Sequence, residues 1–344
     1  SVVHTISHPE DSDKKSKLAL KREILNFLPE VVIFPGWSSC FSAYCLDICK
    51  TLDIRTVLSS DSQASDHARN RIREMIKAKI VQQFDAAFVS GQRAKSYLTQ
   101  LGFPSEYCVE GMNVVDNTHF ERETNAVTKA DGNTPEVEQP YFLCVSRLVE
   151  KKNISSLIEA YMNACSINTS LPRLIIAGDG PQRSKLEELA QSLGGGGRIV
   201  FNGLTSYDEL PSYYAKATAL ILPSRVEPWG LVVNEAMSTS TPAIVSENCG
   251  VAHDLVLNDL TGFVYDPLDA DALTSTLLRF AALNDQTLRE LGKQAKIKAE
   301  TLNGEAYVKN AREGVRLAMS RPKGRNHFTD RAVRLSLSKI RGRE

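Results

Sequence analysis

Short apolar runs alternate with amphipathic stretches through the first third of the chain. Runs of strand length predict strands, and apolar residues at helical spacing predict helices. The predicted strands are Ser1–Ser7, Glu30–Phe34, Arg55–Ser59, Ala86–Ser90 and Tyr107–Glu110, and the predicted helices are Lys15–Phe27, Phe41–Leu52, Asp66–Gln83 and Arg93–Leu101. This alternation predicts a parallel sheet with helices on both faces.

The second half of the chain repeats the pattern. Its predicted strands are Tyr141–Val145, Arg173–Ala177, Arg198–Asn202, Thr218–Leu222, Ala243–Ser246 and Gly262–Tyr265, and its predicted helices are Ile154–Cys165, Gln182–Leu193, Tyr207–Ala217 and Leu231–Ser240, with further helices between Asp269 and Met319. A length of 344 residues allows two domains of common size. The expected fold class is therefore α/β, with two doubly wound, Rossmann-like domains.

The boundary between the two patterns is marked by a polar stretch. Residues 121–139 show no hydrophobic periodicity and few large apolar side chains, which predicts an interdomain linker. The predicted organisation is a first domain at 1–120, this linker, a second domain at 140–320 and a basic tail at 321–344.

Composition excludes several classes of protein. The formal net charge is zero, so no bulk attraction to nucleic acid is expected. The seven cysteines include no C-x2-C pair, which favours reduced core thiols in a cytoplasmic protein. No apolar run approaches the ~18 residues that predict a membrane span. The basic tail can contact anionic lipid headgroups at a membrane surface or stay solvated, and both alternatives remain open. The sequence does not reveal the oligomeric state.

The stretch from Ile221 to Ser240 has the features of a ligand-binding turn. A buried strand ends at Pro223, a short loop follows, and a helix is predicted from Leu231. A helix N-terminus presents free N–H groups that suit a phosphate, and Gly230 lets backbone approach a ligand closely. One loop can thus hold a sugar near Glu227, a diphosphate at the helix end and a ribose at Glu235.

A second polar turn, Ser146–Asn153, follows the first strand of the second half. In an open parallel sheet, ligands bind beyond the carboxyl ends of the strands, where this turn lies. Arg147 offers bidentate phosphate contacts and a lysine a point charge, and fixed cations stabilise the charge that grows on a leaving diphosphate. A solvated basic turn is the alternative, and the pair Lys151–Lys152 leaves open which lysine acts.

These residues also carry a family resemblance. Glu227 and Glu235, with seven residues between them inside PSRVEPWGLVVNEAMS, resemble the E-x7-E motif of retaining GT-B glycosyltransferases of the family 4 type. The resemblance implies two domains facing a cleft, with a nucleoside-diphosphate sugar held mainly by the second. It implies transfer of a hexose-like sugar to the hydroxyl of a carbohydrate or other acceptor, with retention of configuration and without a metal or other cofactor.

The resemblance also implies a role for each matching residue. Glu227 positions the donor sugar, Glu235 holds the ribose, and Leu231 and Val232 supply backbone N–H groups after Gly230. Arg147 and Lys152 match the family's G-R-L-x3-K pair, which binds the donor diphosphate. Gly180 lies in a match to its A-G-D-G-P loop beside the nucleotide, and Leu204 follows a match to its F-x-G motif near the base.

The first domain departs from the family pattern. Relatives usually begin with a strand and a Gly-rich loop, so we expect about 40 or more residues to be absent before Ser1, a truncated domain. Relatives also often place a donor-contacting His after the strand that corresponds to Arg55–Ser59. Here Asp61 is the candidate for that polar role.

Two D-x-D strings, Asp11–Asp13 and Asp269–Asp271, raise the question of a metal-dependent transferase. Each reads as the start of a helix, where Asp is favoured, so no metal site is predicted. Two other functions remain as alternatives: a sugar-nucleotide epimerase on the same fold, which needs no acceptor, and an inactive subunit that binds a nucleotide sugar.

Overall fold

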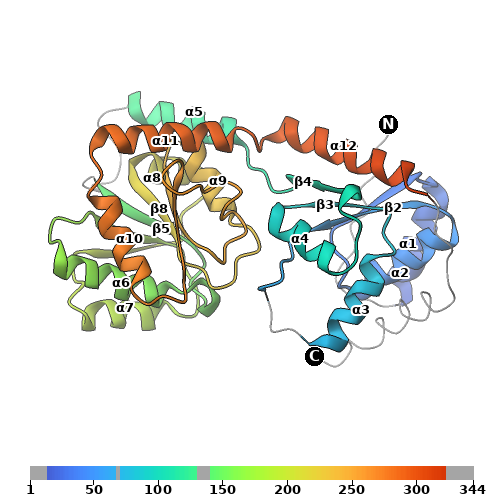
Figure 1. Cartoon of the computed structure of the whole chain (residues 1–344), viewed down its shortest axis with the longest axis horizontal. Helices are drawn as coiled ribbons and strands as arrows, with labels where there is room; N and C mark the ends of the chain where they lie inside the picture. The colour runs from blue at the N-terminus through green and yellow to red at the C-terminus, as the bar shows by residue number, and fades with distance from the viewer. Residues whose placement is uncertain (1–13, 67–69, 130–139, 323–344) are drawn as a thin grey trace. The chain divides into compact units, whose positions relative to one another are not determined.

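The computed structural model describes residues 14–66, 70–129 and 140–322. The chain divides into two compact units (Figure 1). One comprises the residues up to Met112 together with those from Val308 onward, and the other is Asn113–Tyr307. Each unit contains one parallel β-sheet, so the predicted fold class of two Rossmann-like α/β domains is confirmed.

The first unit is built on a four-stranded sheet with the order β1-β2-β3-β4. Its strands are β1 (Val31–Phe34), β2 (Arg55–Ser60), β3 (Ala86–Val89) and β4 (Cys108–Glu110), and its helices are α1 (Lys14–Phe27), α2 (Cys40–Thr51), α3 (Arg71–Val81), α4 (Gln92–Gln100) and a short 3-10 turn, η1 (Ser105–Tyr107). All four residues of β3 are buried, as expected of a parallel strand covered on both faces.

The second unit is built on a six-stranded sheet with the order β10-β9-β8-β5-β6-β7. Its strands are β5 (Tyr141–Val145), β6 (Arg173–Ala177), β7 (Ile199–Gly203), β8 (Ala217–Leu222), β9 (Ala243–Ser246) and β10 (Gly262–Tyr265). Its helices are α5 (Asn117–Lys129), α6 (Ile154–Ile167), α7 (Arg183–Ser192), α8 (Leu210–Lys216), α9 (Leu231–Ser238), α10 (Ala272–Ala281) and α11 (Asp285–Ala299), with a 3-10 turn, η2 (Glu150–Lys152).

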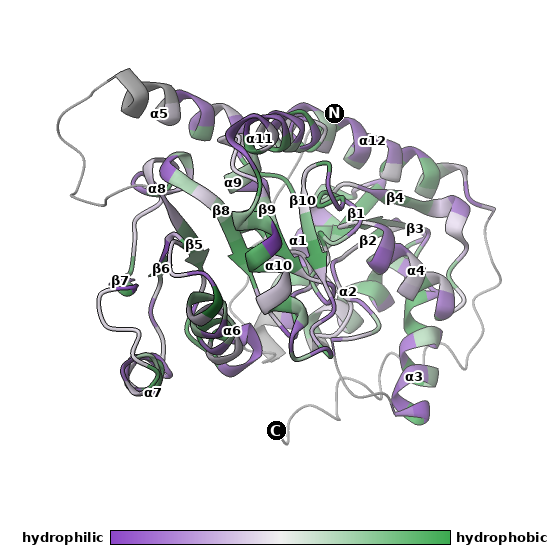
Figure 2. Ribbon diagram, turned by 60° about the vertical axis from the view of Figure 1, so that its left-hand side comes forward, coloured by the Kyte–Doolittle hydropathy of each residue, from purple (hydrophilic) through white to green (hydrophobic). Residues whose placement is uncertain are grey.

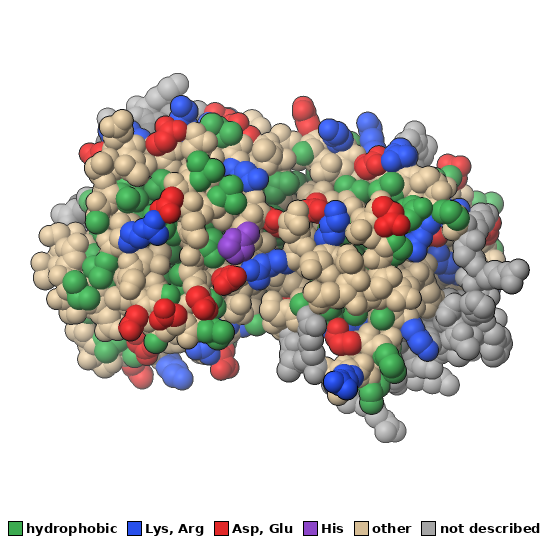
Figure 3. All heavy atoms as spheres, in the orientation of Figure 1, with side chains coloured by type: hydrophobic (Ala, Val, Ile, Leu, Met, Phe, Trp, Pro, Cys, Tyr) green, Lys and Arg blue, Asp and Glu red, His purple; other side chains and the backbone are tan. Residues whose placement is uncertain are grey.

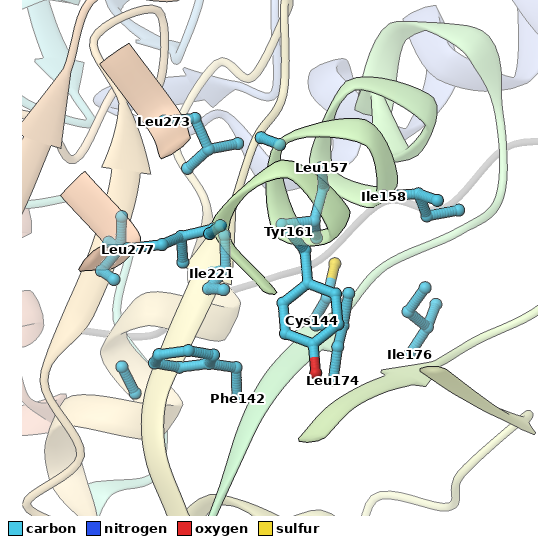
Figure 4. Packing of buried hydrophobic residues seen from close by; sticks show 14 of the residues in the cluster. Phe142, Cys144, Leu157, Ile158, Tyr161, Leu174, Ile176, Ile221, Leu273 and Leu277 are labelled. Atoms are coloured by element: carbon cyan, nitrogen blue, oxygen red, sulfur yellow. The ribbon is translucent and has the colours of Figure 1, made fainter. Parts of the chain in front are cut away.

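Alternate residues of each strand pack on opposite faces of this sheet. In β5, Phe142 and Cys144 join a cluster with α6 and α10 (Figure 4), whereas Tyr141 and Leu143 join a second cluster with α8 and α9. Hydrophobic colouring accordingly concentrates on the strands, while the surrounding helices are mixed (Figure 2). The sheet is therefore the apolar centre of the unit, and a site with polar side chains is expected at its edges.

The strand order reverses between β5 and β8. From β5 the chain runs outward through β6 to β7, and then returns to the other side of β5 at β8 before continuing through β9 to β10. Ligands of open parallel sheets bind outside the carboxyl ends of the strands at such a reversal. The loops that follow β5 and β8 are thus the expected binding position in this unit.

The predicted elements agree with the observed ones, with two differences. α3 begins at Arg71 rather than near Asp66, because the Asn70 side chain accepts hydrogen bonds from the N–H groups of Ile72 and Arg73 and so caps the helix there. The predicted strand Ser1–Ser7 lies outside the described residues.

The second difference falls in the predicted linker, residues 121–139. Its first part continues α5, which begins at Asn117. Phe120 is fully buried in the core of the second unit, and Lys296 on α11 forms an ion pair with Glu121. One buried aromatic anchors this helix although most of its side chains are polar, which is why its pattern carried so little periodicity.

The compact units also divide the chain differently from the predicted domains. The boundary falls after Met112, and α12 (Gly304–Ser320) begins in the second unit but belongs to the first from Val308 onward. Ala318 of this helix packs with Val57 and Phe88 in the core of the first unit. Most of the predicted basic tail, residues 323–344, lies outside the described part of the chain.

Acidic and basic side chains are interspersed on the face drawn in Figure 3, in keeping with a formal net charge of zero. No helix among residues 14–66, 70–129 and 140–322 combines the length and the apolarity that crossing a membrane requires.

Candidate active site

The loop between β8 and α9 is held by the loop that follows β9. Glu227 forms an isolated parallel bridge with Cys249, and the N–H of Gly250 donates a hydrogen bond to the Glu227 carbonyl at 2.9 Å. A Cβ atom on Gly250 would lie 2.0 Å from the carbonyl oxygen of Pro228, so only glycine fits there. This backbone contact fixes the position of Glu227 independently of its side chain.

The start of α9 is shaped by an inward-facing tryptophan. Trp229 is buried, and its Nε1 donates to Asn234 Oδ1 at 2.9 Å. Gly230 follows with a φ of +115° and caps the helix, and a Cβ there would meet a Leu222 methyl at 2.8 Å. Leu231 is 43% exposed, so the first turn of α9 reaches the surface at the carboxyl edge of the sheet. The predicted residues Gly230, Leu231 and Val232 thus lie together at this helix end.

Two predicted residues from distant parts of the second unit meet at the same edge. Lys152, at the end of η2 after β5, forms an ion pair with Glu227 through Nζ and Oε2. The hydroxyl of Ser224 lies 3.2 Å from the same carboxylate oxygen and donates to it. The side chains of Lys152 and Glu227 are only 18% and 12% exposed, so water screens the attraction between them weakly.

The neighbouring lysine has another role. The backbone carbonyl of Lys151 accepts a hydrogen bond from the N–H of Arg225 at 2.9 Å, which joins the loop after β5 to the loop after β8. Its side chain is exposed. Between the two candidate lysines, it is therefore Lys152 that contacts the predicted sugar-binding carboxylate.

Arg147 lies in the same loop as Lys152. Its side chain is exposed, and its guanidinium forms no ion pair with any residue in the described part of the chain. The structure thus places Arg147 at the predicted edge of the sheet, but it does not bring Arg147 into contact with Glu227.

The glycine loop after β6 supports the loop that carries Arg147. Gly178 has a φ of +145°, and a Cβ there would lie 1.8 Å from the Ser146 carbonyl oxygen. The N–H of Leu148 donates to the Asp179 carbonyl at 2.9 Å, and a Cβ on Gly180 would come within 2.5 Å of the Leu148 oxygen. The predicted residue Gly180 therefore packs against the cationic loop and helps to hold its shape.

Glu235 lies on α9 and is mostly buried. The hydroxyl of Tyr214 on α8 donates to its Oε2 at 2.6 Å. Burial raises the pKa of Glu235 above its ordinary value, and the hydrogen bond from Tyr214 partly opposes that rise. Burial and the nearby charge of Glu235 also raise the pKa of Tyr207, so this carboxyl sits in an aromatic, weakly hydrated environment.

The remaining predicted residues lie farther out. Leu204 follows β7 and is 82% exposed, and Asp61 is an exposed residue after β2 in the first unit. Asp271 precedes α10, which agrees with the expectation that Asp269–Asp271 opens a helix. The other D-x-D string, Asp11–Asp13, lies outside the described residues.

Sequence reasoning did not single out two residues that contact the site carboxylates. Ser224 stands in the Pro-Ser dipeptide before Glu227, so its place in the motif was a usable signal. Tyr214 had no such signal, because it belongs to a different helix and reaches Glu235 only through the packing of α8 on α9.

The architecture recurs in solved structures of glycosyltransferases. The structure of a sucrose-phosphate synthase from Thermosynechococcus elongatus matches with a TM-score of 0.70 and 24% identity, covering 88% of this chain and 77% of that one. The structure of HepE from Anabaena in complex with UDP matches with a TM-score of 0.73 and 16% identity, covering 88% and 82%. Likeness at this level of identity defines the fold class, and the chain has the GT-B fold.

Family-level similarity covers the part of the chain that holds the candidate site. Residues 128–298, about half of the chain, match the model of the family described as glycosyl transferases group 1, and this part of the chain belongs to that family. An uncharacterized glycosyltransferase of Methanocaldococcus jannaschii is 32% identical over 153 residues, which are 44% of this chain and 38% of that protein.

A second relative is named for its donor and its acceptor. The GDP-mannose-dependent alpha-(1-6)-phosphatidylinositol monomannoside mannosyltransferase of Mycolicibacterium smegmatis is 33% identical over 149 residues. That alignment covers 41% of this chain and 38% of the relative. The chain thus matches well under half the length of these curated relatives.

Proposed function

We propose that the protein transfers a hexose-like sugar from a nucleoside-diphosphate sugar to an acceptor hydroxyl, with retention of anomeric configuration and without a metal ion. The observation that carries the proposal is the meeting of Lys152 with Glu227 at the strand-order reversal. A cation and a carboxylate are needed there for different parts of one donor, the diphosphate and the sugar.

Charge development explains why a cation belongs at this place. As the bond between the anomeric carbon and the phosphate oxygen breaks, negative charge grows on the leaving diphosphate. Lys152, Arg147 and the N–H groups at the start of α9 would stabilise that charge from fixed positions, and one such contact is typically worth ~3 kcal/mol. Preorganised cations of this kind can replace a divalent ion.

Retention requires the new bond to form on the face that the leaving group vacates. In the proposed reaction the acceptor oxygen bonds to the anomeric carbon, the carbon–oxygen bond to phosphate breaks, and the acceptor proton passes to the leaving phosphate. Glu227 would orient the sugar hydroxyls and need not attack the sugar. Its backbone anchoring through Cys249 and Gly250 suits such a positioning role.

The family and the site support the proposed class of donor. One relative named above is a GDP-mannose-dependent mannosyltransferase, and one of the solved structures is a complex with UDP. A nucleoside-diphosphate sugar is accordingly the proposed donor for this chain. The proposed acceptor is a carbohydrate or another compound with a hydroxyl group. The proposed location is the cytoplasm, which supplies nucleoside-diphosphate sugars.

The test measures release of nucleoside diphosphate from candidate UDP-, GDP- and ADP-sugars, with and without acceptors. We expect the wild type to release nucleoside diphosphate when an acceptor is present. In Glu227→Ala the rate of this release should fall by at least about a hundredfold, while nucleoside diphosphate still binds. Glu290→Ala is the matched control, because Glu290 is an exposed glutamate on α11 that bonds to Gln294 of the same helix.

Two results would contradict the proposal. Undiminished transfer in Glu227→Ala would show that Glu227 does not position the donor sugar. Conversion of the sugar nucleotide to an epimer without any acceptor would identify a different reaction on the same fold.

A further inference from the structure

Tyr214 is a buried aromatic residue whose position is fixed from several sides. It is fully buried on α8, and its ring lies 6.0 Å from that of Phe120. Its backbone carbonyl accepts a hydrogen bond from Thr241 Oγ1 at 2.6 Å. The direction in which its hydroxyl points is therefore determined by the core of the second unit.

That hydroxyl occupies one oxygen of Glu235. Tyr214 donates to Oε2 at 2.6 Å, and no other side chain in the described part of the chain makes a hydrogen bond to the Glu235 carboxylate. The second oxygen, Oε1, thus keeps its capacity to accept hydrogen bonds from a ligand. A carboxylate held through one oxygen by a rigid donor presents the other in a fixed direction.

We propose that Tyr214 is a positioning residue for nucleotide binding: it orients Glu235 so that the carboxylate accepts hydrogen bonds from the 2′- and 3′-hydroxyls of the donor's ribose. The inference deepens the proposed function and rests on it. The ribose contact of Glu235 belongs to the proposed function, and the inference adds the role of Tyr214. The contact can be tested because a ribonucleotide offers this pair of hydroxyl donors and a 2′,3′-dideoxynucleotide offers neither.

The tyrosine also has an electrostatic effect. A carboxylate accepts stronger hydrogen bonds when it is ionised, but burial raises the pKa of Glu235. The hydrogen bond from Tyr214 favours the ionised form and lowers the pKa from where burial alone would place it. Removing the hydroxyl should therefore disturb both the direction and the charge of Glu235.

The experiment compares Tyr214→Phe with the wild type by titration calorimetry. The ligands are whichever of UDP, GDP and ADP binds most tightly, and its 2′,3′-dideoxy counterpart. We expect the wild type to prefer the ribonucleotide, and Tyr214→Phe to weaken ribonucleotide binding about tenfold, because Glu235 loses the donor that orients its carboxylate. Binding of the dideoxynucleotide should stay unchanged.

Tyr161→Phe is the matched control. Tyr161 is also fully buried in the second unit, and its hydroxyl donates to a backbone carbonyl, that of Pro172, at 2.9 Å. We expect this variant to lose a buried hydrogen bond without any change in the preference for the ribonucleotide. If both variants lose a comparable amount of thermal stability, general destabilisation is excluded as the cause of weaker ribonucleotide binding in Tyr214→Phe.

The pH dependence of the preference gives a second readout. The ratio of the two affinities cancels the titration of the phosphates, which both ligands share. In the wild type this ratio should fall as the pH drops through the raised pKa of Glu235, and in Tyr214→Phe the fall should begin at a higher pH.

The outcomes separate the two proposals. If the wild type binds none of the three nucleoside diphosphates, the proposed function is wrong and this inference with it. If the wild type prefers the ribonucleotide but Tyr214→Phe keeps the full preference, only the role of Tyr214 is contradicted. Equal weakening of both ligands would also contradict it, because that pattern indicates a purely structural residue.

Discussion

At the scale of single residues, the pairing of Lys152 with Glu227 is an ion pair in a place where charge is costly. Both side chains are largely buried, and removing two charges from water costs free energy that their mutual attraction often does not recover. An apolar pair of similar volume would serve stability as well or better. The charged pair is therefore better explained by a ligand that needs both charges than by the stability of the loop.

Substitution of each adjacent lysine tests this explanation. Lys152→Gln should lower kcat/KM for sugar transfer by about 10²- to 10³-fold, the usual cost of one lost electrostatic contact in a transition state. Lys151→Gln should change kcat/KM by less than about fivefold, because its side chain is exposed. Steady-state kinetics with one donor and one acceptor measures both effects.

An equal loss in the two variants would mean that the bulk positive charge of the turn matters and not the position of Lys152. The sequence left this choice open, since the two lysines are neighbours in a short turn. The structure distinguishes them because the Lys152 side chain pairs with Glu227, whereas Lys151 contacts Arg225 through its backbone carbonyl and its side chain is exposed.

At the scale of elements, glycines set how closely the loops of the second unit approach. Gly178 lies against the Ser146 carbonyl, with a positive φ and no room for a Cβ. Gly180 and Gly250 meet neighbouring backbone in the same way. These close approaches connect the loop after β6 to the loop after β5, and the loop after β9 to that after β8.

We predict that Gly178→Ala destabilises the protein by about 3 kcal/mol, because the new methyl group clashes with backbone and the φ is unfavourable for alanine. Gly196→Ala is the control. Gly196 lies in the four-glycine run 194–197 before β7, where a Cβ would meet nothing within 4 Å. Its substitution should change stability by less than about 0.5 kcal/mol.

Thermal unfolding, followed with and without nucleoside diphosphate, measures both variants. An unchanged midpoint in Gly178→Ala would show that the loops can separate at little cost, against the tight packing described above. A large loss in Gly196→Ala would instead indicate a structural role for the four-glycine run.

Elements were predicted well where burial follows a regular period. The strands of the second unit other than the edge strand β7 alternate between two apolar clusters, and in β7 buried residues alternate with exposed ones. Their positions were evident from the sequence. α5 was missed because its polar residues outnumber its apolar ones, so its buried anchor Phe120 gave no periodic signal.

At the scale of the whole molecule, the chain returns to the first unit with the second part of α12. Arg321, just past its end, donates through Nη1 to the carbonyl oxygens of Phe84 and Asp85 at 2.7 and 3.2 Å. Its guanidinium also lies over the rings of Phe103 and Tyr107, 5.1 and 4.9 Å from their centroids. A residue at the far end of the sequence is thus bound to the core of the first unit.

We predict that Arg321→Ala destabilises the first unit by about 2 kcal/mol, through lost hydrogen bonds and cation–π contacts. Arg316→Ala is the control, because Arg316 is exposed and its ion pair among the described residues is with Glu313 on the same helix. Hydrogen exchange should rise in β3 of the Arg321 variant and stay unchanged in β6, which belongs to the second unit.

Exchange that rises equally in β3 and β6 would contradict this prediction, since it would mean that the two units unfold together. Unchanged exchange in β3 would show that residues up to Met112 do not depend on the returning segment.

The fold class, the succession of strands and helices, and the loops that carry Glu227 and Arg147 could all be predicted from the order of residues alone. These features follow from local periodicity and from turn residues, which act over a few positions. Which residues meet could be seen only in the folded chain: Lys152 and Glu227 are 75 positions apart, and Arg321 and Phe84 are 237 apart. Such contacts depend on the order of strands in a sheet and on the packing of helices over it, and no short segment encodes that order.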